Sequence, residues 1–439
     1  MTADLERVTS VGGHDIGYPH GHLGHLTAEE EKSFQEFKAF LQEKGLYTPA
    51  GEGKTASCDD ATLLRFLRAR RWSVQDAYVQ FRDTEEWRRR NQLEVLYDTI
   101  DVDAYEETRR LYPQWTGRRD RRGIPLYLFQ IRHLDSKTVS TYEKSTEATT
   151  VSKAKTDGST PQRLLRLFAL YENLTRFAQP LCSALRDRPH AERGTPVTLS
   201  TNIVDVSQVS LRMFWNLKGH MQAASTLATA HYPETLDRIF IIGAPYFFGT
   251  VWGWIKRWFD PVTVSKIFIL PPNEVKSTLE AFIEPRNIPK AYGGELDFEF
   301  FDRPNLDPKI REAVSWENGF TDFPEGPAYW VPEEDGKRMV CLAVGSKGGK
   351  QRRERVCTVP VAVCEGTEEE RAAVGEAETA QVNGTVEVKT EVQEAQTVVD
   401  GVEALAISEE RVVAQEMSEK VAGSGTQTAE EPKIATVSA

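Results

Sequence analysis

The chain has 439 residues, of which 40% are hydrophobic and 27% charged, and its formal net charge is −12. The segment from Glu365 to Ala439 holds 17 acidic and 5 basic residues and so carries that entire net charge. The rest is close to neutral, which gives no reason to expect a nucleic-acid partner. No apolar leader opens the sequence, and no run approaches the ~18–20 apolar residues of a membrane span, so we expect a cytoplasmic protein.

The first hundred residues have the pattern of a small helical subdomain. Residues 1–26 are rich in Gly and His and are expected to form a flexible N-terminus. Thr27 and Glu30 then have the spacing of a capping box, which predicts the start of a helix. Asp59 and Ser73 are suited to cap two further helices. We therefore predict a helical subdomain over residues 27–95.

The pattern changes to alternating strands and helices. Runs of large apolar and β-branched residues predict buried strands at 124–131, 198–206 and 238–244, and a late edge strand at 293–301. Long helical stretches lie between the first three, over 162–185 and 209–231. This alternation predicts crossover units, a mostly parallel sheet and an α/β domain over residues 96–330.

Two stretches are predicted to lack stable structure. Residues 137–160 are rich in Ser, Thr and Lys and are interpreted as a flexible excursion. No aromatic residue follows Trp330, so residues 331–439 are predicted to be a disordered acidic tail. A basic run at 347–355 has two interpretations, contact with anionic lipid or a solvated linker, and base rates favour the linker.

Residues 247–259 are unusual because they are mostly aromatic. On a helical wheel, eight large apolar side chains fall within an arc of about 160°. These are Phe247, Phe248, Val251, Trp252, Trp254, Ile255, Trp258 and Phe259. An amphipathic helix packed on a sheet is the ordinary interpretation. Three tryptophans favour a gate that faces an apolar cavity when shut and a bilayer when open, because Trp prefers membrane interfaces.

Cationic residues gather at one helix end and after the aromatic segment. Arg65 and Arg68 are spaced i, i+3, and exposure of both side chains to solvent explains this spacing. Arg70 and Arg71 stand at a helix C-terminus, where the helix dipole also favours positive charge. Thr263 and Lys266 are three residues apart and share one helical face. A hydroxyl and an ammonium on one face are suited to hold a phosphate.

Four motifs resemble CRAL-TRIO domain proteins, most closely the phosphatidylinositol/phosphatidylcholine transfer branch needed for Golgi secretion. They are TLLRFLRARR (62–71), YPETLDRIFIIGAP (232–245), DPVTVSKIFIL (260–270) and NIPKAYGG (287–294), within a similarity that covers about residues 22–310. The resemblance implies an N-terminal helical subdomain and an α/β lipid-binding domain closed by an amphipathic gate helix. It also implies a carrier that encloses one phospholipid as its ligand, with no cofactor and no catalysis.

The resemblance further implies how the lipid head group is held. The inositol phosphate would be bound by Arg70, Arg71, Glu234, Thr263 and Lys266, which stand at the matching positions of the motifs. One departure is Thr235, where the family has an arginine, so one phosphate contact is missing.

For a choline lipid the family uses two tyrosines and two serines. Tyr127 and Ser200 match one of each, but Thr116 and Ala228 stand at the other two positions. Trp115 offers an aromatic ring for the quaternary ammonium. Phosphatidylinositol is therefore the better supported ligand, and phosphatidylcholine the weaker one.

The remaining expectations concern partners and alternatives. The resemblance implies a monomer that binds Golgi or endosomal membranes peripherally and transiently, with a lipid kinase as a further partner. There are two alternatives within the fold: a carrier of a sterol or another hydrophobic ligand, and a lipid-sensing docking module. Neither would need the head-group residues, so both are less favoured. No Gly-x-Ser-x-Gly or Gly-x-Gly-x-x-Gly motif supports an enzyme. The four N-terminal histidines lack a fixed ligand geometry, so no metal is expected.

Overall fold

A computed structural model describes residues 10–11, 14–15, 17–51, 54–148, 151–258, 261–334 and 336–361. All of them belong to one compact unit, Met1–Gly375, and the second unit, Glu376–Ala439, lies outside the described residues. A two-stranded ribbon of β1 (Ser10–Val11) and β2 (His14–Asp15) begins the described part. Among the described residues, no helix has both the length and the apolar character needed to cross a bilayer.

The N-terminal helices confirm the predicted caps. They are α2 (Ala28–Glu43), α3 (Asp60–Ala69), α4 (Val74–Arg90), α5 (Leu93–Thr99) and α6 (Val102–Arg109). Both hydrogen bonds of the capping box between Thr27 and Glu30 are formed, and Asp59 accepts from the Thr62 amide at 2.8 Å. The predicted flexible N-terminus is wrong for residues 17–26, because Tyr18 and His22 are buried.

The central sheet has five strands in the order β3-β4-β5-β6-β7. Their bounds are β3 (Gln114–Arg119), β4 (Pro125–Gln130), β5 (Ser200–Asp205), β6 (Leu236–Ile242) and β7 (Ile267–Leu270). Only β3 and β4 pair antiparallel, and the other neighbours are parallel. The structure thus confirms the predicted α/β class with a mostly parallel sheet.

Helices connect these strands. Between β4 and β5 lie η1 (Ile131–His133), α7 (Ser136–Ala148), α8 (Gln162–Asn173), the π-helix η2 (Leu174–Ala178) and α9 (Gln179–Ala184). Between β5 and β7 lie α10 (Leu211–His231), α11 (Phe248–Ile255), η3 (Lys256–Trp258) and α12 (Pro261–Ser265). The predicted flexible excursion is wrong where α7 forms, since buried Tyr142 anchors this polar helix through hydrogen bonds to Thr108 and Arg163.

One face of the sheet is covered by the segment that follows β7. This segment contains α13 (Val275–Phe282), η4 (Pro285–Asn287) and η5 (Lys290–Tyr292). The predicted strand at 293–301 is wrong. Only an isolated bridge joins Pro289 to Leu296, and Gly293 has a left-handed φ of 88° that turns the chain.

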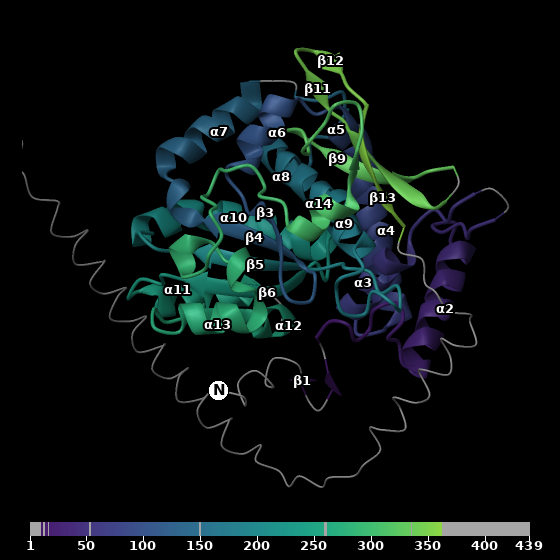
Figure 1. Ribbon diagram of the computed structural model, residues 1–439, viewed down its shortest axis with the longest axis horizontal. Coiled ribbons are helices and arrows are strands. Elements are labelled where there is room, and N and C mark those ends of the chain that lie inside the picture. The colour runs from purple at the N-terminus through teal and green to yellow at the C-terminus, as the bar shows by residue number, and fades with distance from the viewer. Residues whose placement is uncertain are drawn as a thin grey trace, which may run out of the picture. The chain divides into compact units, whose positions relative to one another are not determined.

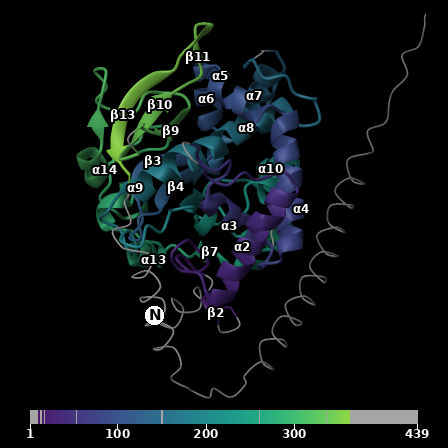
Figure 2. The same cartoon turned by 90° about the vertical axis from the view of Figure 1, so that its right-hand side faces the viewer.

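A second sheet follows where a disordered tail was predicted. It contains β8 (Ser315–Trp316), β9 (Ala328–Pro332), β10 (Arg338–Ala343) and β13 (Glu354–Pro360), after α14 (Pro308–Ala313) and with a hairpin of β11 (Ser346–Lys347) and β12 (Lys350–Gln351). Its strands are all antiparallel, in the order β8-β13-β10-β9. Figure 1 and Figure 2 both show β9 and β13 on the side of the body away from α10.

The predicted boundary at residue 330 is therefore wrong for residues 331–361. Residues 331–361 need no aromatic residue of their own, because their small buried side chains, among them Cys341 and Val356, pack on Phe177 and Trp330. The basic run is also no linker, since Arg353 donates to the Tyr329 hydroxyl at 2.6 Å as part of this fold. The acidic segment beyond residue 361 lies outside the described residues.

Candidate functional site

The face of the central sheet that turns toward α10 and α11 retains apolar surface. Val204, Ile239 and Ile267 lie on this face and are only half-buried, and Ile269 is 40% exposed. On the opposite face Ile203 and Phe240 are fully buried. Successive side chains of a strand point to opposite faces, so one face is core and the other has an incompletely covered apolar floor.

Helix α10 lies over this floor without closing on it. Only Phe214 and Leu217 are buried among its 21 residues. Its other large apolar side chains toward the sheet, Met213, Met221 and Leu227, are half-buried. A helix and a sheet that both keep apolar surface where they face each other are suited to hold an apolar ligand between them.

The predicted gate segment is helical through α11 and η3, whereas Phe259 and the Trp258 side chain lie outside the described residues. Phe248 and Val251 are buried, and Trp252 packs half-buried on the apolar cluster that includes α10 and β6. The Trp254 ring lies 5.2 Å from that of Trp215 in α10. The other two gate residues that are described, Phe247 and Ile255, are half-buried.

Two of the predicted head-group residues form an ion pair. Lys266 Nζ lies 3.0 Å from Glu234 Oε2, and the side chains are 14% and 18% exposed. The Lys266 amide donates to the Thr263 carbonyl at 3.1 Å, so Thr263 lies one turn away. Glu234 has a left-handed φ of 53°, a conformation that costs free energy for a non-glycine residue and is typical of ligand sites.

The Thr235 side chain is turned into the protein and does not extend the Lys266–Glu234 pair. It is buried and its hydroxyl donates to the Tyr232 carbonyl at 3.1 Å. The Thr235 carbonyl in turn accepts from the Ser200 amide at 2.9 Å. The residue that replaces the family's arginine therefore supports the turn and does not replace the missing cation.

Arg70 and Arg71 end helix α3 and are exposed. Within the described part of the chain, neither forms a hydrogen bond or an ion pair through its side chain, so both are available to an anion. The structure does not bring them into contact with Lys266.

The interpretation of Arg65 and Arg68 as solvated surface residues is wrong. Arg65 is 6% exposed and donates to the Pro233 carbonyl at 3.4 Å. Arg68 donates to the Gly21 carbonyl at 3.0 Å and to the Thr198 hydroxyl at 3.4 Å, and its burial lowers its pKa to about 10 even though the Glu234 charge opposes this. Arg65 thus ties α3 to the turn that carries Glu234, and Arg68 ties α3 to Gly21 and Thr198.

His22 is a neighbour of this site that the sequence had presented only as one of four N-terminal histidines weighed as metal ligands. Its Nε2 lies 3.1 Å from the Thr198 hydroxyl. Burial, with the positive charges of Arg68 and Lys266, holds the pKa of His22 well below its usual range. Among the described residues, no group of three or more His, Cys, Asp or Glu side chains is placed to hold a metal ion.

The candidate choline-lipid residues share the open face of the sheet. Trp115 and Tyr127 are cross-strand partners, and Tyr127 is level with Asn202, whose amide donates to the Ser200 hydroxyl at 3.1 Å. The Trp115 ring packs edge-to-face on Phe177 with ring centroids 5.9 Å apart.

The structure also shows where Thr116 and Ala228 lie, the two residues that depart from the family's choline-lipid positions. Thr116 follows Trp115 in β3, so its side chain points to the closed face of the sheet. There its hydroxyl donates to the Leu126 carbonyl, and it cannot contact a choline lipid on the open face. Ala228 is half-buried in α10.

Comparisons with known proteins agree with this architecture. The model of the CRAL/TRIO N-terminal domain matches residues 33–83, and the model of the CRAL/TRIO domain matches residues 109–294. The SEC14 cytosolic factor of Eremothecium gossypii is 30% identical over 278 residues, which cover 63% of this chain and 80% of that protein.

Two further relatives are matched over a smaller share of their length. The SEC14 cytosolic factor of Yarrowia lipolytica is 33% identical over 64% of this chain and 50% of its own. The phosphatidylinositol/phosphatidylcholine transfer protein SFH9 of Arabidopsis thaliana is 29% identical over 65% of this chain and 46% of its own. The match thus spans half or less of these two proteins. The chain belongs to the CRAL/TRIO family, in the branch that contains the Sec14 cytosolic factors.

Proposed function

We propose that this chain is a non-catalytic carrier that encloses one phosphatidylinositol molecule and exchanges it between membranes. The observation that carries the proposal is the half-covered apolar floor of the central sheet, close to the Lys266–Glu234 pair. The name of the Arabidopsis relative assigns the transfer of phosphatidylinositol and phosphatidylcholine to that protein, and we extend the first of these lipids to this chain.

The free energy of moving a bare lipid explains why a carrier needs such a floor. Two acyl chains hold roughly 30 methylenes at about 0.8 kcal/mol each, so bringing them into water costs roughly 24 kcal/mol. An apolar site between α10 and the sheet would remove most of this cost. The gate helix would open at the bilayer, where its tryptophans are favourable.

The head group then requires only a few polar contacts. An ammonium has three N–H donors, so the Lys266 pair with Glu234 leaves donors for the inositol phosphate. Thr263 lies one turn away, and the exposed Arg70 and Arg71 would add positive charge from the end of α3. A sterol carrier or a docking module would have no use for these phosphate ligands.

Phosphatidylcholine is proposed only as a weaker second ligand. Tyr127 and Ser200 share one face, but the Ser200 hydroxyl already donates to the Thr235 carbonyl at 3.1 Å and the Trp115 ring is packed on Phe177. We also propose a cytoplasmic monomer without a cofactor. It would associate peripherally with Golgi or endosomal membranes and present its lipid to a lipid kinase.

Mass spectrometry of lipid that co-purifies with the full chain tests the proposal directly. We expect one phospholipid per chain, enriched in phosphatidylinositol relative to the host membrane. A chain that carries a sterol, or no lipid while it is folded by circular dichroism, would contradict it.

A further inference from the structure

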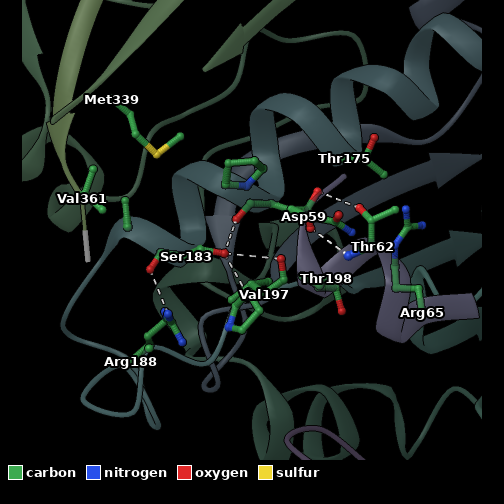
Figure 3. A pocket seen from close by; sticks show the side chains of 16 residues that line it. Asp59, Thr62, Arg65, Thr175, Ser183, Arg188, Val197, Thr198, Met339 and Val361 are labelled. Atoms are coloured by element: carbon green, nitrogen blue, oxygen red, sulfur yellow. Dashed lines mark hydrogen bonds between the residues drawn. The ribbon is translucent and has the colours of Figure 1, made fainter. Parts of the chain in front are cut away.

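A cavity lies beside α3 and includes Thr198, the residue whose hydroxyl lies 3.1 Å from His22 Nε2. It has a volume of about 270 Å³ and opens between α3, the π-helix with α9, the loop at 194–198 and the second sheet, as Figure 3 shows. Met339 of β10 and Val361, which follows β13, contribute one wall. Both residues lie beyond residue 294, where the match to the CRAL/TRIO domain ends.

The size of this cavity excludes the transported lipid. At ~30 Å³ per water molecule, 270 Å³ corresponds to about nine waters. Two acyl chains with roughly 30 methylenes need several times that volume. Any ligand of this cavity is therefore a small molecule.

A buried cation lines one end of the cavity. Arg188 is 5% exposed and donates to the Tyr18 hydroxyl at 3.2 Å and the Ser183 carbonyl at 2.8 Å. Within the described residues it forms no ion pair, because the neighbouring Asp187 pairs with Arg119 at 2.9 Å. A buried charge without a counter-ion is costly, and a bound anion would supply one.

Two buried N–H donors of residues that line the cavity lack acceptors. The Nε of Arg188 and the Nε2 of Gln179, a residue only 4% exposed, have no hydrogen-bond partner among the described residues. Gln179 and Ser183 are four residues apart in α9 and so share one helical face. A guanidinium and an amide with free N–H groups are suited to an oxyanion.

The other end of the cavity is less suited to an anion. Arg65 lines it, but so does Asp59, whose negative charge acts on Arg65. In Figure 3 Arg65 and Arg188 lie on opposite sides of the view, and Ser183 lies between Arg188 and the wall of Met339 and Val361. Arg188, Met339 and Val361 all line this one cavity, so a ligand in it has access to both a positive charge and apolar surface.

We propose that this cavity binds a small organic anion, with its phosphate or carboxylate group at Arg188 and Gln179 and its carbon skeleton against Met339 and Val361. A guanidinium binds phosphate and carboxylate oxygens in the same way, so both groups suit this site. Titration with one ligand of each kind distinguishes them. The site is distinct from the proposed phosphatidylinositol site, which depends on Lys266.

Isothermal titration calorimetry of the full chain tests this site. The titrants are glycerol 3-phosphate, butyrate and inorganic phosphate, with glycerol as the neutral control. We expect at least one of the two organic anions to bind more tightly than inorganic phosphate, and glycerol not to bind. Arg188→Gln should weaken binding about tenfold or more, because hydrogen bonds to a charged group are lost. The exposed Arg286 provides the matched control Arg286→Gln, which should leave binding unchanged.

A second variant separates the ligand contact from the structural role of Arg188. Met339→Trp fills the cavity at its apolar wall and leaves the bonds of Arg188 to Tyr18 and Ser183 in place, and it should abolish binding. Three results would overturn the proposal: neither organic anion binds, inorganic phosphate binds as well as both, or binding persists in Met339→Trp. Loss of binding in Lys266→Ala would assign the anion to the head-group site instead.

Discussion

The two faces of the central sheet are built from similar residues but differ in burial. On the closed face Ile203 and Phe240 are fully buried under α13 and the segment that follows it. On the open face Ile239 and Ile267 are half-buried under α10 and α11. Burial of apolar side chains by protein stabilises the fold, whereas apolar surface left open is available to a ligand. The same strands thus serve as core on one side and as a binding floor on the other.

A buried polar network joins α4 and α8 to the end of α10. Buried Glu172 of α8 accepts from Arg88 of α4 at 2.6 Å and from the Tyr232 hydroxyl at 2.6 Å. Arg176 lies 3.5 Å from the same carboxylate. Directed bonds of this kind fix α4 and α8 to Tyr232, the residue that follows α10.

The closed face should give the largest effect. We expect Ile203→Ala to lower the free energy of unfolding by about 2–5 kcal/mol, because it leaves a cavity in a fully buried cluster. Urea unfolding followed by circular dichroism measures this. A loss below about 1 kcal/mol would show that this face is not the core.

The polar network should make stability sensitive to acid. Burial raises the pKa of Glu172, but the charge of Arg88 and its hydrogen bonds outweigh this and lower the pKa to about 2. Because the folded-state pKa is depressed, the stabilisation is fully present above the unfolded value of about 4.5 and is lost as the pH falls toward 2. The shift corresponds to roughly 3 kcal/mol. Glu172→Gln should flatten the unfolding free energy between pH 4.5 and 2, and an unchanged pH profile would contradict this assignment.

The gate should affect membrane binding more than stability. Trp254→Glu is expected to weaken vesicle association by up to about 2–3 kcal/mol, because a charge at a bilayer is costly. Far-UV circular dichroism should stay near that of the wild type. Phe301, 40% exposed and outside the gate, provides the control Phe301→Glu. Equal vesicle binding by both variants and the wild type would place the gate away from the bilayer.

The smallest effect on stability is expected on the open face. Ile239→Ala is the matched partner of Ile203→Ala on the neighbouring strand, and it should cost only about 1 kcal/mol because Ile239 is half-buried. It should nevertheless reduce lipid loading, measured by lipid co-purification. Equal losses of unfolding free energy in Ile203→Ala and Ile239→Ala would contradict the difference between the two faces.

The sequence predicted β4, β5 and β6, the caps and the crossover helices, because each is encoded within a short window, but it did not predict β3 and β7. The burial of Arg65 was missed, although Arg65 stands within the run Leu63–Leu67, whose other members are large apolar residues, and this run was a readable signal. The second sheet was missed because its core partner Phe177 lies far away in the chain. Which face of the central sheet stays open was also beyond prediction, since both faces are apolar.

Side-by-side transfer of labelled phosphatidylinositol and phosphatidylcholine by the wild type and Lys266→Ala tests the central claim most directly. Losing the charged contact of Lys266 in a partly buried site should cost ~2–5 kcal/mol, some thirtyfold or more in affinity for phosphatidylinositol. Any phosphatidylcholine transfer should change far less, because Tyr127 and Ser200 lie on the sheet. Lys290→Ala, at a lysine 61% exposed, is the control. Selective loss of phosphatidylinositol transfer is the predicted result, and undiminished phosphatidylinositol transfer or equal loss of both lipids would contradict it.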